Sequence, residues 1–204
     1  MTGVFYRVMY RLGLTPWEEM ATLPIAEQIL GLFDRAEQGR IPPYGSALDV
    51  GCGSGIWSVR LAQRGWDVTG IDIVPRALRR ARERSRRAGV DLLLYEADVT
   101  ALRDSDVGDG FDLILDFGTV HGLRPKQRIA AGRELSAVAA PGATLLMLAF
   151  TPGHRGPLPR GVSRSEIEAT YPGWTVAEEL PQDLRGAPAV VRRARPSWYR
   201  LRRG

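Results

Sequence analysis

Acidic side chains and a histidine follow short apolar runs in this chain of 204 residues. Asp72, Asp98 and Asp116 each stand at or just after such a run, and His121 comes shortly after Asp116. A carboxylate accepts hydrogen bonds without offering a competing donor, which suits it to hydroxyl and amine groups. An imidazole, with an ordinary pKa of about 6.5, can remove a proton at neutral pH. These residue types predict a site that holds a polar ligand and moves a proton.

A glycine-rich stretch, LDVGCGSG at residues 48–55, precedes all of these side chains. It continues an apolar run that predicts a buried strand, and residues 56–63 are predicted to form a helix. Glycine has no Cβ, so the backbone can turn tightly and lie against a ligand. The free N–H groups of the following helix point to the same place. Strand, loop and helix together predict a pocket for a ligand that carries a negative group.

The spacing of the glycines excludes two common nucleotide motifs. A dinucleotide fingerprint requires Gly-x-Gly-x-x-Gly. Counted from Gly51 the third glycine would fall at Ile56, and counted from Gly53 it would fall at Ser58. A phosphate-binding P-loop requires Gly-Lys-Ser/Thr at its end, and no lysine is nearby.

The same stretch closely resembles the first motif of class I S-adenosylmethionine-dependent methyltransferases. The resemblance covers roughly the central half of the chain. It implies S-adenosylmethionine as the cofactor and no metal. The cofactor contacts that it implies are Asp49, Gly51, Cys52, Gly53, Asp72, Ile73, Asp98, Val99 and Asp116.

Two of the acids have separate reasons for their predicted roles. Asp72 ends a second short apolar run, where a carboxylate in nucleotide-binding sheets accepts hydrogen bonds from ribose hydroxyls. In the resembled family, an acid at the position of Asp98 reaches the exocyclic amine of adenine, with Val99 as an apolar contact. Glu96 is expected to be exposed.

Catalysis is predicted at the end of the fourth strand. Ligands of open α/β sheets bind at the carboxyl edge, so Asp116 is expected beside the methyl donor and His121 near the acceptor. His121 is the first candidate for a general base, and His154 is the second. Asp116 would orient the base or the acceptor. The competing interpretation of His121 is a packed histidine that bonds only to the backbone.

The sequence predicts an N-terminal helical arm over residues 1–45 and a cofactor-binding core over residues 46–204. Tyr10 and Trp17 are predicted to face the cofactor or acceptor, with ordinary packing of Tyr6, Tyr10 and Trp17 as an equal alternative. A helix is predicted to begin at Thr15 and Pro16, and apolar residues at helical spacing predict another from residue 25 to residue 36.

Strands and helices alternate through the centre of the chain, which predicts a single-domain, doubly wound α/β sheet. Later strands are predicted at residues 91–95, 110–116, 143–150, 174–180 and 197–201. The helix at 125–139 is expected to bury Ile129, Leu135 and Val138, and Pro141-Gly142 is expected to form a turn. The resemblance implies a seven-stranded, Rossmann-like sheet whose last strand is inserted antiparallel.

Composition limits the partners. The net charge is +5 and the pI about 9.9, and all but one of the 28 basic residues are arginine. The arginines are spread along the chain, with local density at residues 76–87 and 192–203, and we interpret them as compositional bias. We expect no nucleic-acid partner, because no aromatic stacking platform accompanies them. We expect no membrane partner, because no apolar run reaches the roughly 18 residues that span a bilayer. A single cysteine allows no intrachain disulfide, so we expect a cytoplasmic protein. We expect the protein to be a monomer or a homodimer.

The resulting hypothesis is methyl transfer to a hydroxyl of a small polar acceptor, of the sugar or phenol type, with histidine-assisted deprotonation. The residues 116–119, DFGT, depart from the Asn/Asp-Pro-Pro-Tyr/Phe motif of amino-methylating DNA enzymes, which disfavours a target base. Transfer to a thiol or halide, as in thiopurine-like enzymes, is one alternative. A cofactor-binding module without activity is the other.

Overall fold

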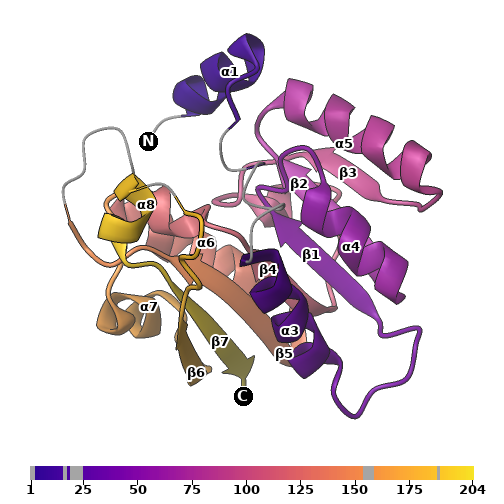
Figure 1. Ribbon diagram of the computed structural model, residues 1–204. Coiled ribbons are helices and arrows are strands. Elements are labelled where there is room, and N and C mark those ends of the chain that lie inside the picture. The colour runs from indigo at the N-terminus through magenta and orange to yellow at the C-terminus, as the bar shows by residue number, and fades with distance from the viewer. Residues whose placement is uncertain (1–2, 16–17, 19–24, 154–158, 188) are drawn as a thin grey trace.

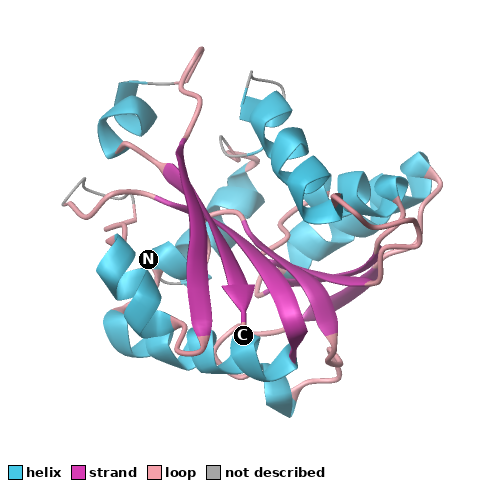
Figure 2. Ribbon diagram, turned by 90° about the horizontal axis from the view of Figure 1, so that it is seen from below, coloured by secondary structure: helices cyan, strands magenta, loops and turns pink. Residues whose placement is uncertain are grey.

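A seven-stranded sheet with helices on both faces forms the centre of the computed structural model (Figures 1 and 2). The structure describes residues 3–15, 18, 25–153, 159–187 and 189–204. The strands are β1 (Ser46–Val50), β2 (Asp67–Asp72), β3 (Leu93–Glu96), β4 (Phe111–Asp116), β5 (Ala139–Ala149), β6 (Trp174–Pro181) and β7 (Ser197–Arg203). The helices are α1 (Gly3–Leu12), α3 (Ile25–Glu37), α4 (Ile56–Arg64), α5 (Pro75–Ala88), α6 (Pro125–Val138), α7 (Arg164–Thr170) and α8 (Ala189–Ala194), with short 3-10 turns η2 (Leu102–Asp104) and η3 (Val120–Gly122).

The strand order is β3-β2-β1-β4-β5-β7-β6, with β1 to β5 parallel. β7 enters antiparallel between β5 and β6. This confirms the predicted single-domain, seven-stranded sheet with its inserted antiparallel strand. The chain reverses its direction of strand addition between β1 and β4, so a crevice opens there at the carboxyl ends of the strands.

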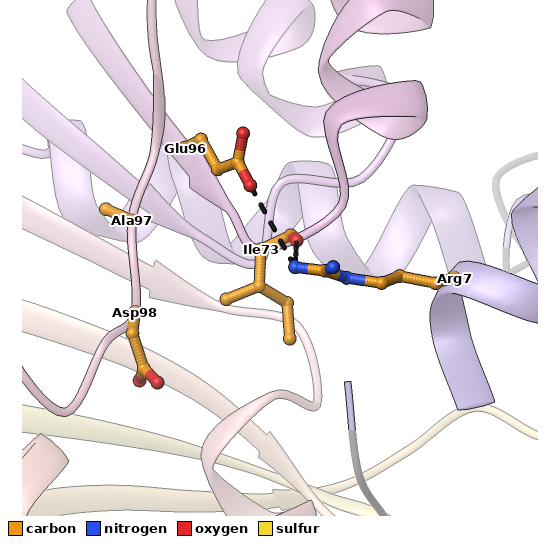
Figure 3. Close-up of a pocket in the computed structure, with 5 residues that line it drawn as sticks. All are labelled: Arg7, Ile73, Glu96, Ala97 and Asp98. Atoms are coloured by element: carbon orange, nitrogen blue, oxygen red, sulfur yellow. Dashed lines mark hydrogen bonds and ion pairs between the residues drawn. The ribbon is translucent and has the colours of Figure 1, made fainter. Parts of the chain in front are cut away.

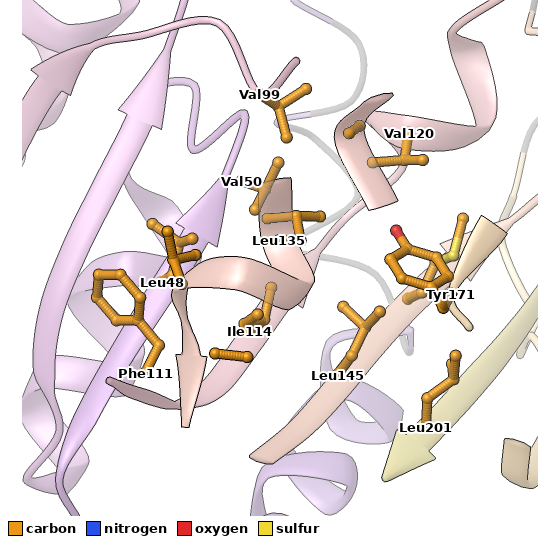
Figure 4. Packing of buried hydrophobic residues seen from close by; sticks show 14 of the residues in the cluster. Leu48, Val50, Val99, Phe111, Ile114, Val120, Leu135, Leu145, Tyr171 and Leu201 are labelled. Atoms are coloured by element: carbon orange, nitrogen blue, oxygen red, sulfur yellow. The ribbon is translucent and has the colours of Figure 1, made fainter. Parts of the chain in front are cut away.

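Two apolar clusters hold the layers together, because burial of apolar surface is the main favourable contribution to folding. On one face, α6 and α7 cover the sheet, and Figure 4 shows Leu135 and Tyr171 packed against strand residues such as Ile114 and Leu145. On the other face, residues of α3 and α4 pack against β1, β4 and β5.

Helix α3 is tied to this second face by a buried ionic contact. Glu37 is 7% exposed and accepts hydrogen bonds from Arg64 Nε at 2.8 Å and from Trp66 Nε1 at 2.9 Å. Because Ile29 and Phe33 also lie fully buried in the cluster, α3 belongs to the packed core. The predicted division at residue 45 stays a prediction.

Three expectations need correction or fall outside the described residues. Ile129 is 45% exposed, so the prediction of an inward position was wrong, whereas Leu135 and Val138 are buried. Pro141 and Gly142 lie within β5 rather than in a turn before it, at a register irregularity opposite β4. The helix expected to begin at Thr15 and Pro16 falls largely on residues that the structure does not describe.

Candidate functional site

The glycine loop between β1 and α4 is closed in from two sides. Gly51 and Gly53 both have positive φ, at 65° and 57°, a region that side-chain-bearing residues rarely adopt. A Cβ on Gly51 would overlap the Thr119 hydroxyl, and a Cβ on Gly53 would lie 2.6 Å from the Tyr10 hydroxyl. Only glycine therefore fits these two positions, and the loop backbone is left close to whatever enters the crevice.

Asp72, at the end of β2, is 8% exposed and holds the loop in place. Its Oδ2 accepts the Gly53 N–H at 2.9 Å, and its Oδ1 accepts the Val74 N–H at 2.8 Å. Burial raises the pKa of Asp72 although these two N–H groups oppose the shift. Each carboxylate oxygen has more than one lone pair, so Asp72 can accept further hydrogen bonds from a ligand.

Asp49 and Asp116, on the adjacent strands β1 and β4, are also buried. Asp49 Oδ2 accepts the Ser58 hydroxyl at 2.5 Å, and Asp116 Oδ1 accepts the Thr119 N–H at 2.6 Å. Burial raises the pKa of each carboxyl to about 7, and these hydrogen bonds offset part of that shift. The Asp72 charge further raises the pKa of Asp49, and the Asp49 charge that of Asp116.

Three neighbouring parallel strands thus end in three buried acids around one glycine loop. Buried carboxylates are costly without a compensating charge. A ligand with a positive group would supply that charge and favour their ionised forms.

A cavity of about 240 Å³ lies beyond the end of β2 (Figure 3). It is lined by Arg7, Ile73, Glu96, Ala97 and Asp98. The Arg7 guanidinium donates from Nη2 to the Ile73 carbonyl at 3.2 Å and lies 3.9 Å from Glu96 Oε1. Helix α1 therefore supplies one wall of a cavity whose other walls come from the residues after β2 and β3.

Asp98 is exposed, and its Oδ1 accepts hydrogen bonds from the N–H and hydroxyl of Thr100 at 2.9 and 2.8 Å. This leaves Oδ2 for other donors. Val99 is 6% exposed and packs in the core, and Glu96 is exposed as expected. Ile73 and Asp98 thus line the same cavity, as a shared site requires.

Helix α1 places two tyrosines at this crevice. Tyr10 is 2% exposed, packs with Val74, and lies under the Arg80 guanidinium at 5.6 Å. Tyr6 packs beside it, and its pKa is raised to about 12 by burial and then by the charges of Asp72 and Asp116. The sequence analysis named Tyr10 as a site residue and weighed Tyr6 with it, but missed Arg7. The only available signal for Arg7 was its helical spacing with Tyr10.

Cys52 is buried inside the loop. Its N–H donates to the Ile71 carbonyl at 2.8 Å, and its Sγ would lie 3.0 Å from a Cβ on Gly70. Burial, followed by the charges of Asp49 and Asp72, raises the pKa of the thiol well above its ordinary value. Cys52 is therefore a neutral thiol that packs beneath the loop.

His121 lies in η3 and is 2% exposed. Its Nδ1 accepts the Phe150 N–H at 2.9 Å, and the two rings lie 4.7 Å apart. Since a backbone N–H can only donate, a neutral His121 carries its proton on Nε2. A Cβ on Gly118 would lie 3.4 Å from Nε2, which places this nitrogen over the loop that follows Asp116.

Phe117 continues a row of aromatic rings at the same edge of the sheet. Its ring centroid lies 5.7 Å from Trp57 and 5.6 Å from Trp198, and Trp57 in turn lies 6.2 Å from Phe33. Phe117 is half-buried, directly after the buried Asp116. Trp57, Trp198 and Phe33 are buried, so Phe117 is the one ring of this row that is partly exposed beside the acidic part of the crevice.

Two predicted residues, Trp17 and His154, lie outside the described residues. In the part of the chain that the structure describes, no three His, Cys, Asp or Glu side chains are grouped to hold a metal ion. None of the described helices combines the length and apolar character needed to cross a bilayer.

Comparison of the sequence with known proteins identifies a methyltransferase family. Residues 47–142 match a family model described as a methyltransferase domain. The 2-heptyl-1-hydroxyquinolin-4(1H)-one methyltransferase of Mycobacteroides abscessus is 32% identical over 155 residues, which are 72% of this chain and 66% of that protein. A ubiquinone biosynthesis O-methyltransferase of Cereibacter sphaeroides is 36% identical over 113 residues, 54% of this chain. The chain spans 66% and 45% of the lengths of these two relatives.

Solved structures with the same fold superpose on nearly the whole chain. The N-methyltransferase NodS of Bradyrhizobium japonicum, in complex with S-adenosylhomocysteine, superposes with a TM-score of 0.74 at 21% identity, over 92% of this chain and 91% of that one. The 1,6-didemethyltoxoflavin-N1-methyltransferase of Burkholderia thailandensis gives a TM-score of 0.73 at 19% identity, over 98% and 86%.

Proposed function

Because the chain belongs to the class I S-adenosylmethionine-dependent methyltransferase family, we propose that it transfers the methyl group of S-adenosylmethionine to a hydroxyl of a small polar acceptor, of the phenol type. The observation that carries the proposal is the meeting of Asp49, Asp72 and Asp116 around the glycine loop. These buried acids suit a cofactor with positive groups, and a row of aromatic rings adjoins them.

The residues present fit the cofactor. When bound, S-adenosylmethionine supplies a methyl group activated by a positively charged sulfur. Asp72 would accept from its ribose hydroxyls, and Asp98 would accept from its adenine amine. Ile73 would provide an apolar contact, whereas the side chain of Val99 is buried in the core, and Arg7 would cover the adenine end from α1. Alignment of the two reactants can by itself lower a barrier by about 7–11 kcal/mol in favourable cases.

We infer an aromatic acceptor because one could contact the ring of Phe117. Offset or edge-on contact with another ring contributes about 0.5–1.5 kcal/mol beyond area burial. The two curated relatives support an oxygen acceptor, since one is named for a hydroxyquinolinone and the other as an O-methyltransferase. Within the two acceptor types expected from the sequence, this favours the phenol type over the sugar.

Loss of the acceptor proton is the step in which His121 would act. The base role requires an unprotonated Nε2, so the proton would have to sit on Nδ1 and the bond from the Phe150 N–H would have to break. His154 is the second candidate from the sequence, and Asp116 is a third, because burial raises its pKa to about 7, near the range that suits a base at neutral pH. An acidic hydroxyl needs the least help from either residue.

The test is release of S-adenosylhomocysteine from the purified protein with a panel of acceptors: phenols and N-hydroxy heteroaromatics, sugars, thiols and iodide. We expect turnover with the aromatic hydroxyls. His121→Ala and His154→Ala are compared on the best acceptor across neutral pH. A loss of about 10²–10⁴-fold in one variant, with unchanged cofactor affinity, would identify the base.

Other outcomes decide between the alternatives. Turnover with thiols or iodide alone would replace the proposal by S- or halide methylation. Tight binding of S-adenosylhomocysteine without turnover on any acceptor class would favour a binding module without activity.

A further inference from the structure

The positive charge of the protein is concentrated on one helix. Helix α5 contains seven arginines and a single acid, Glu83. The net charge of the entire chain is +5, so the remainder carries no net positive charge. The exposed arginines are Arg76, Arg79, Arg82, Arg86 and Arg87. The local density of arginines at residues 76–87 is thus an exposed, positively charged surface of one helix.

Most of this charge is not neutralised within the protein. Among the described residues, the only ion pair of α5 joins Arg87 to Glu83 at 3.6 Å. Arg82 and Arg84 donate to backbone carbonyls, of Leu94 at 3.1 Å and of Ser54 at 2.9 Å. These contacts leave the positive charges in place, so α5 presents a cationic surface to solvent.

Helix α1 lies beside α5 and adds exposed apolar side chains (Figure 1). Its aromatic side, with Tyr10, is turned inward against Val74 and Arg80. On the outside, Val8 is 48% exposed and Leu12 is 62% exposed. Arg7 and Arg11 are also exposed and lie on the helix between these two residues and the tyrosine side, and Leu14, 55% exposed, follows the helix.

We propose that the exposed side of α1 and the arginine side of α5, here called the basic face, dock on a lipid surface that contains anionic headgroups. An interfacial helix combines apolar side chains with basic residues, and each Arg near such a surface adds to attraction by the headgroups. The face has both parts. The outward apolar residues are aliphatic and the tyrosines point inward, so the face lacks the exposed stacking rings that single-stranded nucleic acids require.

Docking would also place the cavity close to the lipid. Arg7 lines the cavity and lies in α1, between the exposed Val8 and the interior. The docking proposal does not depend on methyltransferase activity, because it concerns only the outer surface of these helices.

The experiment is sedimentation of the purified full chain with vesicles of phosphatidylcholine alone, or of phosphatidylcholine with phosphatidylglycerol. We expect binding only to the anionic vesicles and release as salt is raised, because salt screens the attraction. A duplex DNA and a single-stranded RNA oligonucleotide are measured in parallel.

Three double variants locate the face. Arg79→Glu with Arg86→Glu should lower vesicle affinity by roughly tenfold or more, since two charges on the face are reversed. The double variant Val8→Ser with Leu12→Ser removes two exposed apolar side chains. It should weaken the part of the vesicle binding that remains when salt is raised. The matched control reverses two exposed arginines elsewhere, Arg133→Glu in α6 with Arg193→Glu in α8, and should keep wild-type binding at the same net charge.

Unchanged binding of S-adenosylhomocysteine would show that the variants are folded. The proposal is overturned if the anionic vesicles do not bind the wild type, or if the control pair loses affinity as much as the α5 pair. Tighter binding to an oligonucleotide than to the vesicles, lost in the α5 pair, would assign the face to nucleic acid instead.

Discussion

Two features of Gly53 disfavour a side chain, its backbone conformation and its closeness to Tyr10, and mutations can separate their effects. Its φ of 57° is unfavourable for any side chain, and a Cβ would lie 2.6 Å from the Tyr10 hydroxyl. We expect Gly53→Ala to lower the affinity for S-adenosylhomocysteine by roughly tenfold or more, because crowding of a packed site costs about 1–3 kcal/mol. Isothermal titration calorimetry measures the change.

The matched control is Gly89→Ala at the end of α5. Gly89 has a similar φ of 65°, but a Cβ there would meet nothing within 4 Å. This variant should lose about 1–2 kcal/mol of stability from its backbone conformation alone. Its cofactor affinity should equal that of the wild type. Equal affinities of the two variants would remove Gly53 from the site.

The raised pKa of the buried Asp116 should make the stability of the folded protein depend on pH, in a direction that can be worked out. Its pKa in the folded protein is about 7, above the ordinary value of 3.8, because burial disfavours the charge. Between these two pH values the folded state retains a proton that the unfolded state has lost, so the contribution of Asp116 to stability falls as pH rises from about 4 to 7.

Asp116→Asn should therefore become more stable relative to the wild type as the pH rises from 5 to 8. The amide oxygen can still accept the Thr119 N–H, but the amide nitrogen replaces Oδ2, which accepts the Val120 N–H at 3.1 Å. That loss does not depend on pH, so the trend with pH reports the charge. Thermal unfolding across this range measures it, with the exposed Asp109→Asn as a control that should show no trend. A difference independent of pH would contradict the raised pKa.

The acids of the site were predictable, because each directly follows an apolar run that forms a parallel strand. Asp72 and Asp116 lie at the expected carboxyl edge. Tyr6 and Arg7 were not predictable in this way, because only the folding of α1 onto the loops brings them there. The hydrogen bond from Phe150 to His121 also depends on tertiary contact.

Helix α1 offers a clean comparison between two of its arginines. Arg7 lines the cavity and donates to the Ile73 carbonyl, whereas Arg11 is exposed one turn later. We expect Arg7→Ala to weaken S-adenosylhomocysteine binding by roughly three- to tenfold, the effect of about one hydrogen bond. Arg11→Ala should leave it unchanged. Titration of both variants tests α1 as a wall of the site, and parallel losses would assign the effect to helix stability.

Regular elements were predictable where an apolar period was clear. The helices predicted at residues 56–63 and 125–139 occur as α4 (Ile56–Arg64) and α6 (Pro125–Val138). The short helix α8 was missed because its six residues carry little periodic signal. The predicted burial of Ile129 was wrong because helical spacing alone does not show how far the apolar face of the helix extends.

Across the whole molecule, the central strands are packed on both faces, whereas helix α1 makes few contacts with the rest of the described chain. β1, β4 and β5 are buried on both faces, whereas α1 contacts mainly the start of α5. Hydrogen exchange should be slow in the central strands with or without ligand. Added S-adenosylhomocysteine should slow exchange in residues 3–12. Mass spectrometry of peptides from this segment tests it, and unchanged exchange there with protection of the glycine loop would argue against closure by α1.

The row of rings from Trp57 through Phe117 to Trp198 has an optical consequence. Two indoles lie within 6 Å of the half-buried ring beside Asp116. By contrast, the indole of Trp174 donates to Ser136 at the opposite end of the sheet, and that of Trp66 donates to Glu37 beneath α3. An aromatic acceptor seated on Phe117 would change the emission of the first pair and leave the second pair as an internal reference. The protein thus carries its own fluorescent reporter for the arrival of an acceptor.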